Sequence, residues 1–203
     1  MPNSHTLFCH ASGMLLEDNG TVLRNPEAGS DGLLTSHFEN HRFSPGPLES
    51  DFYRFDSWLP VSRRLAGSNA PVTYKSEKFA QHLGLSNLYV TFSGYWPERG
   101  IEMLTGTFKE CEAFSVCARV PENAGTLVVA SAGNTARAFA HVCSRNHLPL
   151  VLVIPEANLD VLWQPERLNP CVRVVAVGGD SDYADAIRVA GTISSLPGFL
   201  PEG

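Results

Sequence analysis

The chain has 203 residues, of which 43% are hydrophobic and 18% charged, and its formal net charge is -6 at pH 7. This length and apolar content suffice for one or two domains with a buried core. The acidic balance argues against nucleic acid as a partner, because no basic stripe is available to neutralise phosphates. We expect a cytoplasmic protein with no membrane partner, because the chain begins without a signal-peptide pattern and contains no run of roughly 20 apolar residues.

Residues 1–50 are rich in Gly, Asn, Asp, Ser and Pro and show little periodicity, which predicts an irregular or ribbon-like segment. Cys9 is the only cysteine in this segment, whereas a structural zinc site needs four soft ligands at ribbon spacing, so we predict no metal. His37 and His41 could share a helix face, but the pattern is not H-E-x-x-H and the nearby Pro and Gly disfavour a helix. The five cysteines of the chain include no C-x-x-C pair, which indicates reduced thiols.

A second predicted domain, residues 51–203, alternates strands with helices. Apolar periodicity predicts helices at 75–83, 109–120, 134–146 and 182–195, and strands at 88–92, 126–130, 149–154 and 172–177. Alternation of this kind implies an α/β fold whose parallel sheet is covered by helices on both faces.

The last predicted helix has its own pattern. The turn before it, Gly178–Ser181, is interpreted as a strand-to-helix connection in which Asp180 or Ser181 caps the helix. Apolar residues recur along the helix at helical spacing and predict one buried stripe. These residues are Tyr183, Ile187, Ala190 and Ile193.

Lys109 follows the run Leu-Thr-Gly-Thr-Phe and falls in the first turn of a predicted helix. A lysine becomes a nucleophile or base when its pKa falls well below about 10.4, and the partial positive charge at a helix start favours such a fall. Such an amine can form an imine with an aldehyde cofactor. Glu112 would raise the pKa if it reached the amine, and the spacing leaves that open. The alternative is a solvated surface lysine.

A strand-to-helix turn begins 22 residues after Lys109, at Ser131. Gly133 allows close approach of the backbone to a ligand, Ser131 or Asn134 can cap the helix, and free N–H groups can bind an anion. A carboxylate or phosphate would fit this turn. The alternative is an ordinary helix cap without a ligand.

Longer motifs around these two sites resemble a known family. They are FDSWLPV (55–61), TYKSE (73–77), LGLSNLYVTFSGYWPERG (83–100), TFKE (107–110), ASAGNTARAFAHV (130–142) and GDSDYADAIRVAG (179–191). The chain resembles the pyridoxal-phosphate enzymes of the tryptophan-synthase-like fold, and within them the cysteate synthase branch of the threonine-synthase-like group. The resemblance covers most of residues 52–203 and implies the amino-terminal half of a fold type II enzyme.

The resemblance implies a role for each site residue. Lys109 would bind pyridoxal 5'-phosphate as an imine, and Asn134 would hydrogen-bond the ring hydroxyl oxygen of the cofactor. Four further residues would hold the substrate carboxylate; they are Ser131, Ala132, Gly133 and Thr135. The implied reaction is a β-replacement in which O-phospho-L-serine loses phosphate through an aminoacrylate and sulfite adds to give L-cysteate, a step in coenzyme M biosynthesis.

The chain also departs from the family. It lacks paired cysteines in its ribbon-like segment and a later glycine-rich loop for the cofactor phosphate, so we expect it to be part of a longer enzyme that can form a homo-oligomer. Cys111 occupies a position where an apolar residue is expected, which predicts a core substitution. Two alternatives remain: threonine synthase or a related phospho-amino-acid lyase, and a non-catalytic binding module that kept the fold.

Overall fold

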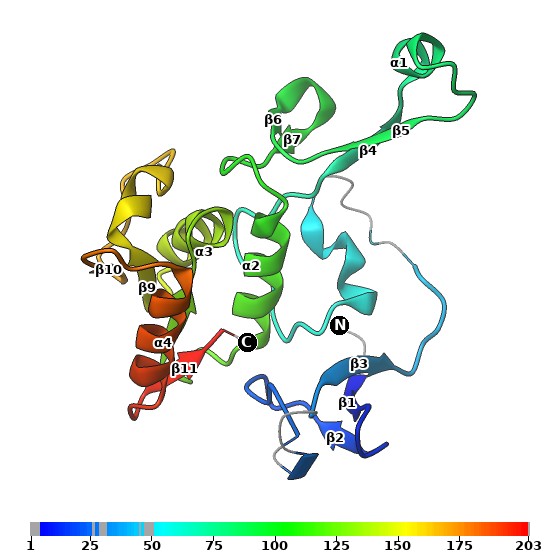
Figure 1. Cartoon of the computed structure of the whole chain (residues 1–203). Coiled ribbons are helices and arrows are strands. Elements are labelled where there is room, and N and C mark those ends of the chain that lie inside the picture. Colours follow the sequence, from blue (N-terminus) through cyan, green and yellow to red (C-terminus); the bar gives the residue numbers. More distant parts are fainter. Residues whose placement is uncertain (1–4, 26, 29–31, 45, 47–50, 203) are drawn as a thin grey trace.

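The computed structural model describes residues 5–25, 27–28, 32–44, 46 and 51–202. Its centre is a four-stranded sheet in the order β10-β9-β8-β11, in which every pair of neighbours is parallel (Figure 1). The strands are β8 (Thr126–Ala130), β9 (Leu150–Pro155), β10 (Val172–Val177) and β11 (Phe199–Pro201). The first three match the apolar runs predicted from the sequence, and β9 is buried along its whole length, as expected for a central parallel strand.

Helices cover both faces of this sheet, which confirms the predicted α/β class. Alternate residues of β8 point to opposite faces, so Leu127 and Val129 join the core under α2 (Lys109–Arg119) and α3 (Asn134–Arg145). On the other face, Val128 packs with α4 (Tyr183–Ser194). The boundaries of these three helices differ from the sequence prediction by at most one residue.

α2 and α3 pack directly against each other. Cys117 and Cys143 meet between the helices with their sulfur atoms 3.6 Å apart, and both are buried free thiols, as predicted. Both helices also contribute small side chains to the surrounding core. The fully buried ones are Ala113, Ala118, Ala136, Ala138 and Ala140.

An antiparallel sheet in the order β2-β1-β3 occupies the ribbon-like segment. Its strands are β1 (His5–Cys9), β2 (Leu15–Glu17) and β3 (Leu34–Phe38). Within the described residues, no group of three or more His, Cys, Asp or Glu side chains comes together as possible metal ligands. The predicted domain boundary at residue 50 lies at residues outside the described ranges and stays a prediction.

A third unit projects from the body at the upper right of Figure 1. It consists of the hairpin β4 (Val72–Lys75) and β5 (Tyr89–Phe92), with the short helix α1 (Glu77–His82) between its strands. The helix and β5 were predicted, whereas β4 was not. The remaining short elements are the hairpin β6 (Tyr95–Trp96) and β7 (Ile101–Glu102), and the 3-10 helices η2 (Phe52–Trp58), η3 (Pro97–Arg99) and η4 (Glu156–Val161).

Two predictions about α4 are wrong. Its cap is Asp182, whose side chain accepts a hydrogen bond from the Asp185 backbone N–H, rather than Asp180 or Ser181. The predicted stripe is only partly buried, because Tyr183 and Ile187 are about half exposed. Ala190 and Ile193 of the stripe do pack against the sheet, together with Ala186 and Val189 from outside it.

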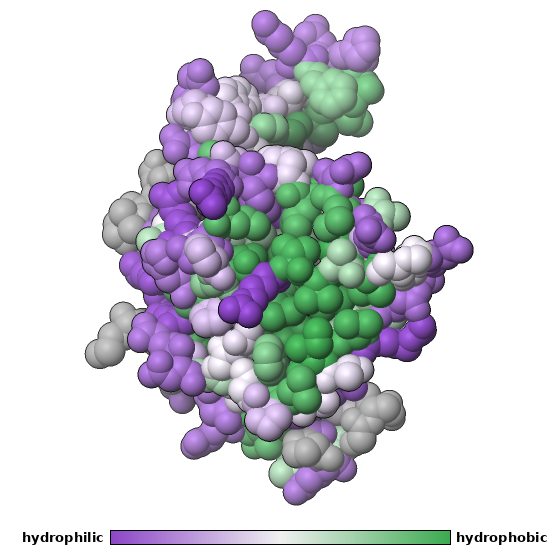
Figure 2. Space-filling view, turned by 90° about the vertical axis from the view of Figure 1, so that its left-hand side faces the viewer, coloured by the Kyte–Doolittle hydropathy of each residue, from purple (hydrophilic) through white to green (hydrophobic). Residues whose placement is uncertain are grey.

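An exposed apolar surface lies beside α4. Figure 2 shows apolar residues gathered on the face of the molecule that carries β10 and α4. Val174 and Val175 of β10, an edge strand of the four-stranded sheet, are 39% and 36% exposed. Among the described helices, none is long and apolar enough to cross a membrane.

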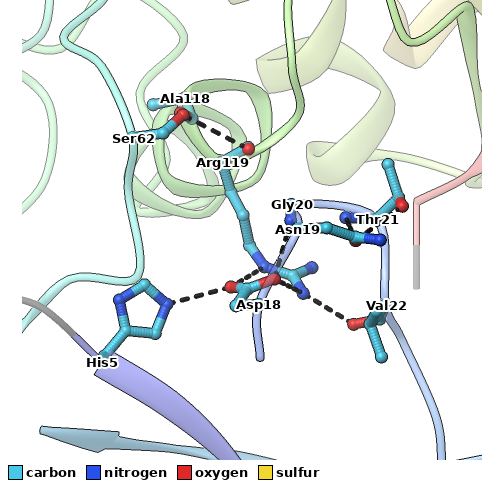
Figure 3. Close-up of polar contacts among 9 residues, drawn as sticks. All are labelled: His5, Asp18, Asn19, Gly20, Thr21, Val22, Ser62, Ala118 and Arg119. Atoms are coloured by element: carbon cyan, nitrogen blue, oxygen red, sulfur yellow. Dashed lines mark hydrogen bonds and ion pairs between the residues drawn. The ribbon is translucent and has the colours of Figure 1, made fainter. Parts of the chain in front are cut away.

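Asp18 joins the amino-terminal sheet to the end of α2 (Figure 3). Its carboxylate accepts hydrogen bonds of 2.9 and 2.8 Å from the Arg119 guanidinium and lies 2.9 Å from His5 Nε2. Burial alone would raise the pKa of Asp18, but the hydrogen bonds from Arg119 and His5 outweigh burial and lower it. At Gly20, with φ +84°, a Cβ would lie 2.4 Å from the Arg119 carbonyl oxygen, so only glycine fits this junction.

We predict that Asp18→Asn lowers the free energy of unfolding by about 2–3 kcal/mol at pH 7, because Arg119 would lose its buried partner. The effect should fade as the pH falls through the lowered pKa of Asp18, since the wild-type carboxylate is then protonated as well. Urea unfolding at pH 7 and at pH 3 measures both. Asp56→Asn, which removes the more exposed pair with Arg64, is the control and should cost less than about 1 kcal/mol. Equal losses in the two variants would contradict the anchoring role.

Candidate active site

Lys109 is the first residue of α2, and the loop before it sets its position. Gly106 has φ +65°, a left-handed conformation that glycine adopts without strain. The Thr107 hydroxyl oxygen then accepts a hydrogen bond of 3.2 Å from the Lys109 backbone N–H. The sequence Thr-Gly-Thr-Phe-Lys therefore makes a tight turn that leads directly into α2, with the lysine side chain one-third exposed.

Glu110 holds the same loop from inside the protein. Glu110 is only 1% exposed. Its Oε2 accepts hydrogen bonds from the Thr105 backbone N–H at 2.8 Å and from the Thr105 hydroxyl at 2.5 Å. The sequence analysis did not predict this contact. A carboxylate in a first helical turn, five residues after a threonine in a glycine-containing loop, was the signal for this contact.

The amine of Lys109 is paired with an acid. Its Nζ lies 2.5 Å from Glu112 Oε2, one helical turn along α2. The hydrogen bond to Glu112 raises the pKa of Lys109, and further carboxylate charge from Glu202 adds to the effect. The expectation that the helix start would lower this pKa is therefore wrong in the structure as it stands, because a direct ion pair outweighs the helix dipole.

Glu202 is a second acid beside the amine, and sequence reasoning missed it. Burial and the neighbouring Glu112 carboxyl group raise the pKa of Glu202 to about 7, while Lys109 acts in the opposite direction. The residue follows β11, which runs beside β8, so only strand pairing brings it to α2. A carboxyl group with a pKa near 7 can exchange a proton at neutral pH.

A pocket of about 240 Å³ adjoins Glu202 on the α4 side of the sheet. Tyr183 lines it, and the Tyr183 hydroxyl lies 3.5 Å from the Ala130 carbonyl oxygen at the end of β8. The remaining lining is mostly apolar or small: Val128, Ala130, Ile187, Ala190, Gly191, Ser194 and Pro201. The half-exposed side chains of α4 thus face a concave space next to the acid.

The turn between β8 and α3 is built around Ser131. Its hydroxyl oxygen accepts hydrogen bonds from the backbone N–H groups of Gly133 at 3.2 Å and Ala136 at 3.0 Å. Gly133 is the N-cap residue of α3 and no side chain caps it, so the prediction that Ser131 or Asn134 is the cap is wrong; the Ser131 hydroxyl instead binds the Ala136 N–H from two residues before the N-cap. In the described structure, the N–H groups that keep no protein partner in this turn are those of Ala132, Asn134 and Thr135.

Gly133 leaves open space beside the turn. A Cβ built on Gly133 would meet no atom within 4 Å. Its φ of -178° is extended backbone that any residue adopts, so the glycine is not required by the local conformation. The available room and the unpaired N–H groups are what an anionic group would need to approach the helix start.

The two predicted sites meet at one end of the α2–α3 pair. Arg137, in the first turn of α3, donates a hydrogen bond of 3.0 Å from Nε to the Thr105 carbonyl oxygen in the lysine loop. Its Nη2 donates to Asn134 Oδ1 at 2.7 Å. The structure therefore brings the Lys109 loop and the Asn134 turn together, and the residue that joins them was not among the predicted site residues.

The sequence of the chain matches the model of a known protein family. The sequence profile of the family described as "Pyridoxal-phosphate dependent enzyme" matches residues 66–200. The chain belongs to this family. Pyridoxal phosphate is accordingly the cofactor of the family, and the predicted α/β fold of that family is confirmed.

Curated relatives narrow the comparison. The chain is 50% identical over 151 residues to the cysteate synthase of Methanosarcina barkeri, covering 74% of this chain and 36% of the relative. It is 45% identical over 203 residues to that of Methanothrix thermoacetophila, covering 98% and 47%. It is 42% identical over 204 residues to that of Methanoculleus marisnigri, covering 100% and 46%. The chain spans about half the length of these relatives, and the predicted resemblance is confirmed.

We predict that Glu112→Gln makes the Lys109 amine react about threefold faster with an acylating reagent near pH 9. The reason is that loss of the carboxylate lowers the pKa of Lys109, so more of the amine is neutral. Peptide mass spectrometry of the labelled protein measures the rate, and Lys75 and Lys78 serve as references within the same chain. Glu122→Gln, at a surface pair with Arg63, is the matched control. An unchanged Lys109 rate in Glu112→Gln would show that the ion pair does not control the amine.

Proposed function

We propose that this chain carries the lysine and the carboxylate-binding turn of a β-replacement enzyme that converts O-phospho-L-serine and sulfite to L-cysteate and phosphate. The observation that carries the proposal is the 42–50% identity to three curated cysteate synthases, which extends over both loops of the candidate site. When bound, pyridoxal phosphate would supply the electron sink for this chemistry.

The residues of the site fit such a cofactor and substrate. Lys109 presents an amine at a helix start, where it would hold the cofactor aldehyde carbon. Asn134 keeps its Nδ2 amide group for the ring hydroxyl oxygen, since its Oδ1 accepts from Arg137. Ala132 and Thr135 offer unpaired backbone N–H groups for the substrate carboxylate, with Ser131 and Gly133 shaping the turn.

Lys109 and the two acids near its amine, Glu112 and Glu202, would carry out the proton transfer. When the substrate amine replaces Lys109 on the cofactor, Lys109 Nζ would be free to take the α-proton of the substrate. This proton transfer requires the neutral form of the Lys109 amine. Glu112, which lies within hydrogen-bonding distance, would stabilise the positive charge at this nitrogen afterwards, and the nearby charge of Glu202 would add to the effect. The same nitrogen would return the proton after sulfite has added.

Two alternatives use the same site. A threonine synthase or related lyase would share the lysine and the carboxylate turn, and a non-catalytic module would bind a carboxylate ligand without reacting with the cofactor. Product analysis separates the three functions. A cysteate synthase should yield cysteate from phosphoserine and sulfite, a threonine synthase should yield threonine from phosphohomoserine alone, and a non-catalytic module should yield neither product. We propose further a cytoplasmic location, small-molecule substrates, homo-oligomer formation and a role in coenzyme M biosynthesis, as expected from the sequence.

The first prediction is that borohydride traps pyridoxal phosphate on Lys109. The intact mass of the protein should rise by the mass of one reduced pyridoxyl phosphate group. Peptide sequencing should place this adduct on Lys109 rather than on Lys75 or Lys78, which lie outside the candidate site. Lys109→Ala should abolish the specific adduct while the far-ultraviolet circular dichroism is retained. Equal labelling of all three lysines, or an adduct that persists in Lys109→Ala, would favour the non-catalytic module.

The second prediction concerns the carboxylate turn. Gly133→Ala should change the free energy of unfolding by less than about 1 kcal/mol, because the new methyl group meets no atom within 4 Å. The same methyl group would occupy the space beside the unpaired N–H groups, so we expect at least about tenfold weaker binding of phosphoserine to the cofactor-loaded protein. Calorimetric titration measures the affinity. Unchanged affinity would place the substrate carboxylate elsewhere; Gly191→Ala, which also meets no atom within 4 Å, is the control.

A further inference from the structure

Arg137 is a buried cation with an unusual set of partners. The residue is 9% exposed, and in the described part of the protein no carboxylate forms an ion pair with it. Burial of an unpaired charge costs several kcal/mol unless other groups compensate for lost water. The site must therefore supply that compensation from uncharged groups.

The compensation comes from three separate segments. Nε donates to the Thr105 carbonyl oxygen at 3.0 Å, Nη2 to Asn134 Oδ1 at 2.7 Å, and Nη1 to the Val161 carbonyl oxygen at 3.3 Å. The guanidinium carbon lies 4.4 Å from the centre of the Trp163 ring, a cation–π contact. One side chain thus links the lysine loop, the start of α3 and the end of η4.

The contact with Asn134 fixes the direction of its amide. A guanidinium group has only donors, so the atom of Asn134 that faces Arg137 must be Oδ1. Nδ2 consequently points away from Arg137 as a donor. A partner of Nδ2 has to accept a hydrogen bond, and an ionised oxygen accepts more strongly than a protonated hydroxyl.

We propose that Arg137 is a positioning residue that holds Asn134 with its amide N–H group toward the cofactor and ties this amide to the loop that carries Lys109. The proposal rests on the proposed function, because it assigns the Asn134 amide to the ring oxygen of pyridoxal phosphate. Arg137 itself touches neither cofactor nor substrate; it acts through Asn134 and Thr105. Its consequence is that the ionised form of the ring oxygen is favoured.

A role in packing alone is the competing explanation. It predicts that any buried side chain of similar volume would serve and that loss of Arg137 would affect stability without a specific effect on Asn134. Arg137→Met keeps length and volume but removes all three hydrogen bonds, and Arg137→Lys keeps the charge. Arg145→Met changes an exposed residue in the last turn of the same helix, removes equal charge and is the matched control.

The first measurement uses the cofactor-free protein. Hydrogen exchange of peptides covering residues 104–108 and 131–136 should become about tenfold faster in Arg137→Met, since each loop loses a buried hydrogen bond. Arg137→Lys should give an intermediate rate, and Arg145→Met should match the wild type. Unchanged exchange in both peptides of Arg137→Met would overturn the link between the loops. Should Arg137→Met not fold, Arg137→Lys supplies the same comparison.

The second measurement uses the absorbance of the bound cofactor, whose ionised and protonated forms differ in wavelength. The pH at which the two forms are equal should rise by about one unit in Arg137→Met, because the Asn134 amide is no longer held as a donor. The other charged groups of the site, Lys109, Glu112 and Glu202, are unchanged in this variant. Asn134→Ala should produce the same rise.

The double variant decides between positioning and packing. If Arg137 acts through Asn134, Arg137→Met in the Asn134→Ala background should add no further shift in this pH. Additive shifts would overturn the proposal. If the wild-type protein forms no adduct at Lys109, the proposed function and the assignment of the amide to the cofactor both fail, while the exchange rates still decide whether Arg137 links the two loops.

Discussion

The close packing of α2 against α3 is the constraint on which the candidate site depends. Fully buried alanines of both helices lie in the core around this contact, and the thiols of Cys117 and Cys143 are 3.6 Å apart between the helices. Arg137, in the first turn of α3, binds both Thr105 and Asn134, so the loop before Lys109 and the turn that carries Asn134 are tied together at one end of this contact. A larger side chain between the helices would move this loop and this turn apart and with them the site.

Buried polar side chains then set the positions of the loops that precede the helices. Glu110 binds Thr105 from one side, and Arg137 binds the carbonyl group of the same residue from the other. Such groups are costly unless their hydrogen bonds are made, so they favour one arrangement of the loops over all others. The precision of the site thus comes from residues that need not touch a ligand.

The charges around Lys109 define what the amine can do. Glu112 and Glu202 hold it in the ammonium form in the cofactor-free protein, although the chemistry of the family requires a neutral amine at the moment of attack. The two observations are compatible, because a carboxylate pair that stabilises the ammonium form can also accept or share the proton that the amine must lose. A carboxyl group whose pKa is about 7 is suited to that exchange.

The sequence by itself determined the alternation of strands and helices, the buried faces of α2 and α3, the family, and the candidate roles of Lys109 and the 131–135 turn, because these are local patterns of spacing and residue type. Only the tertiary structure decided which acid reaches the amine, that Tyr183 and Ile187 line a pocket instead of the core, and that Arg137 joins the two loops. Glu202 shows why: it is 93 residues from Lys109 along the chain, and only the pairing of β11 with β8 brings it to α2. Contacts of this kind depend on the order of strands in the sheet, which periodicity does not encode.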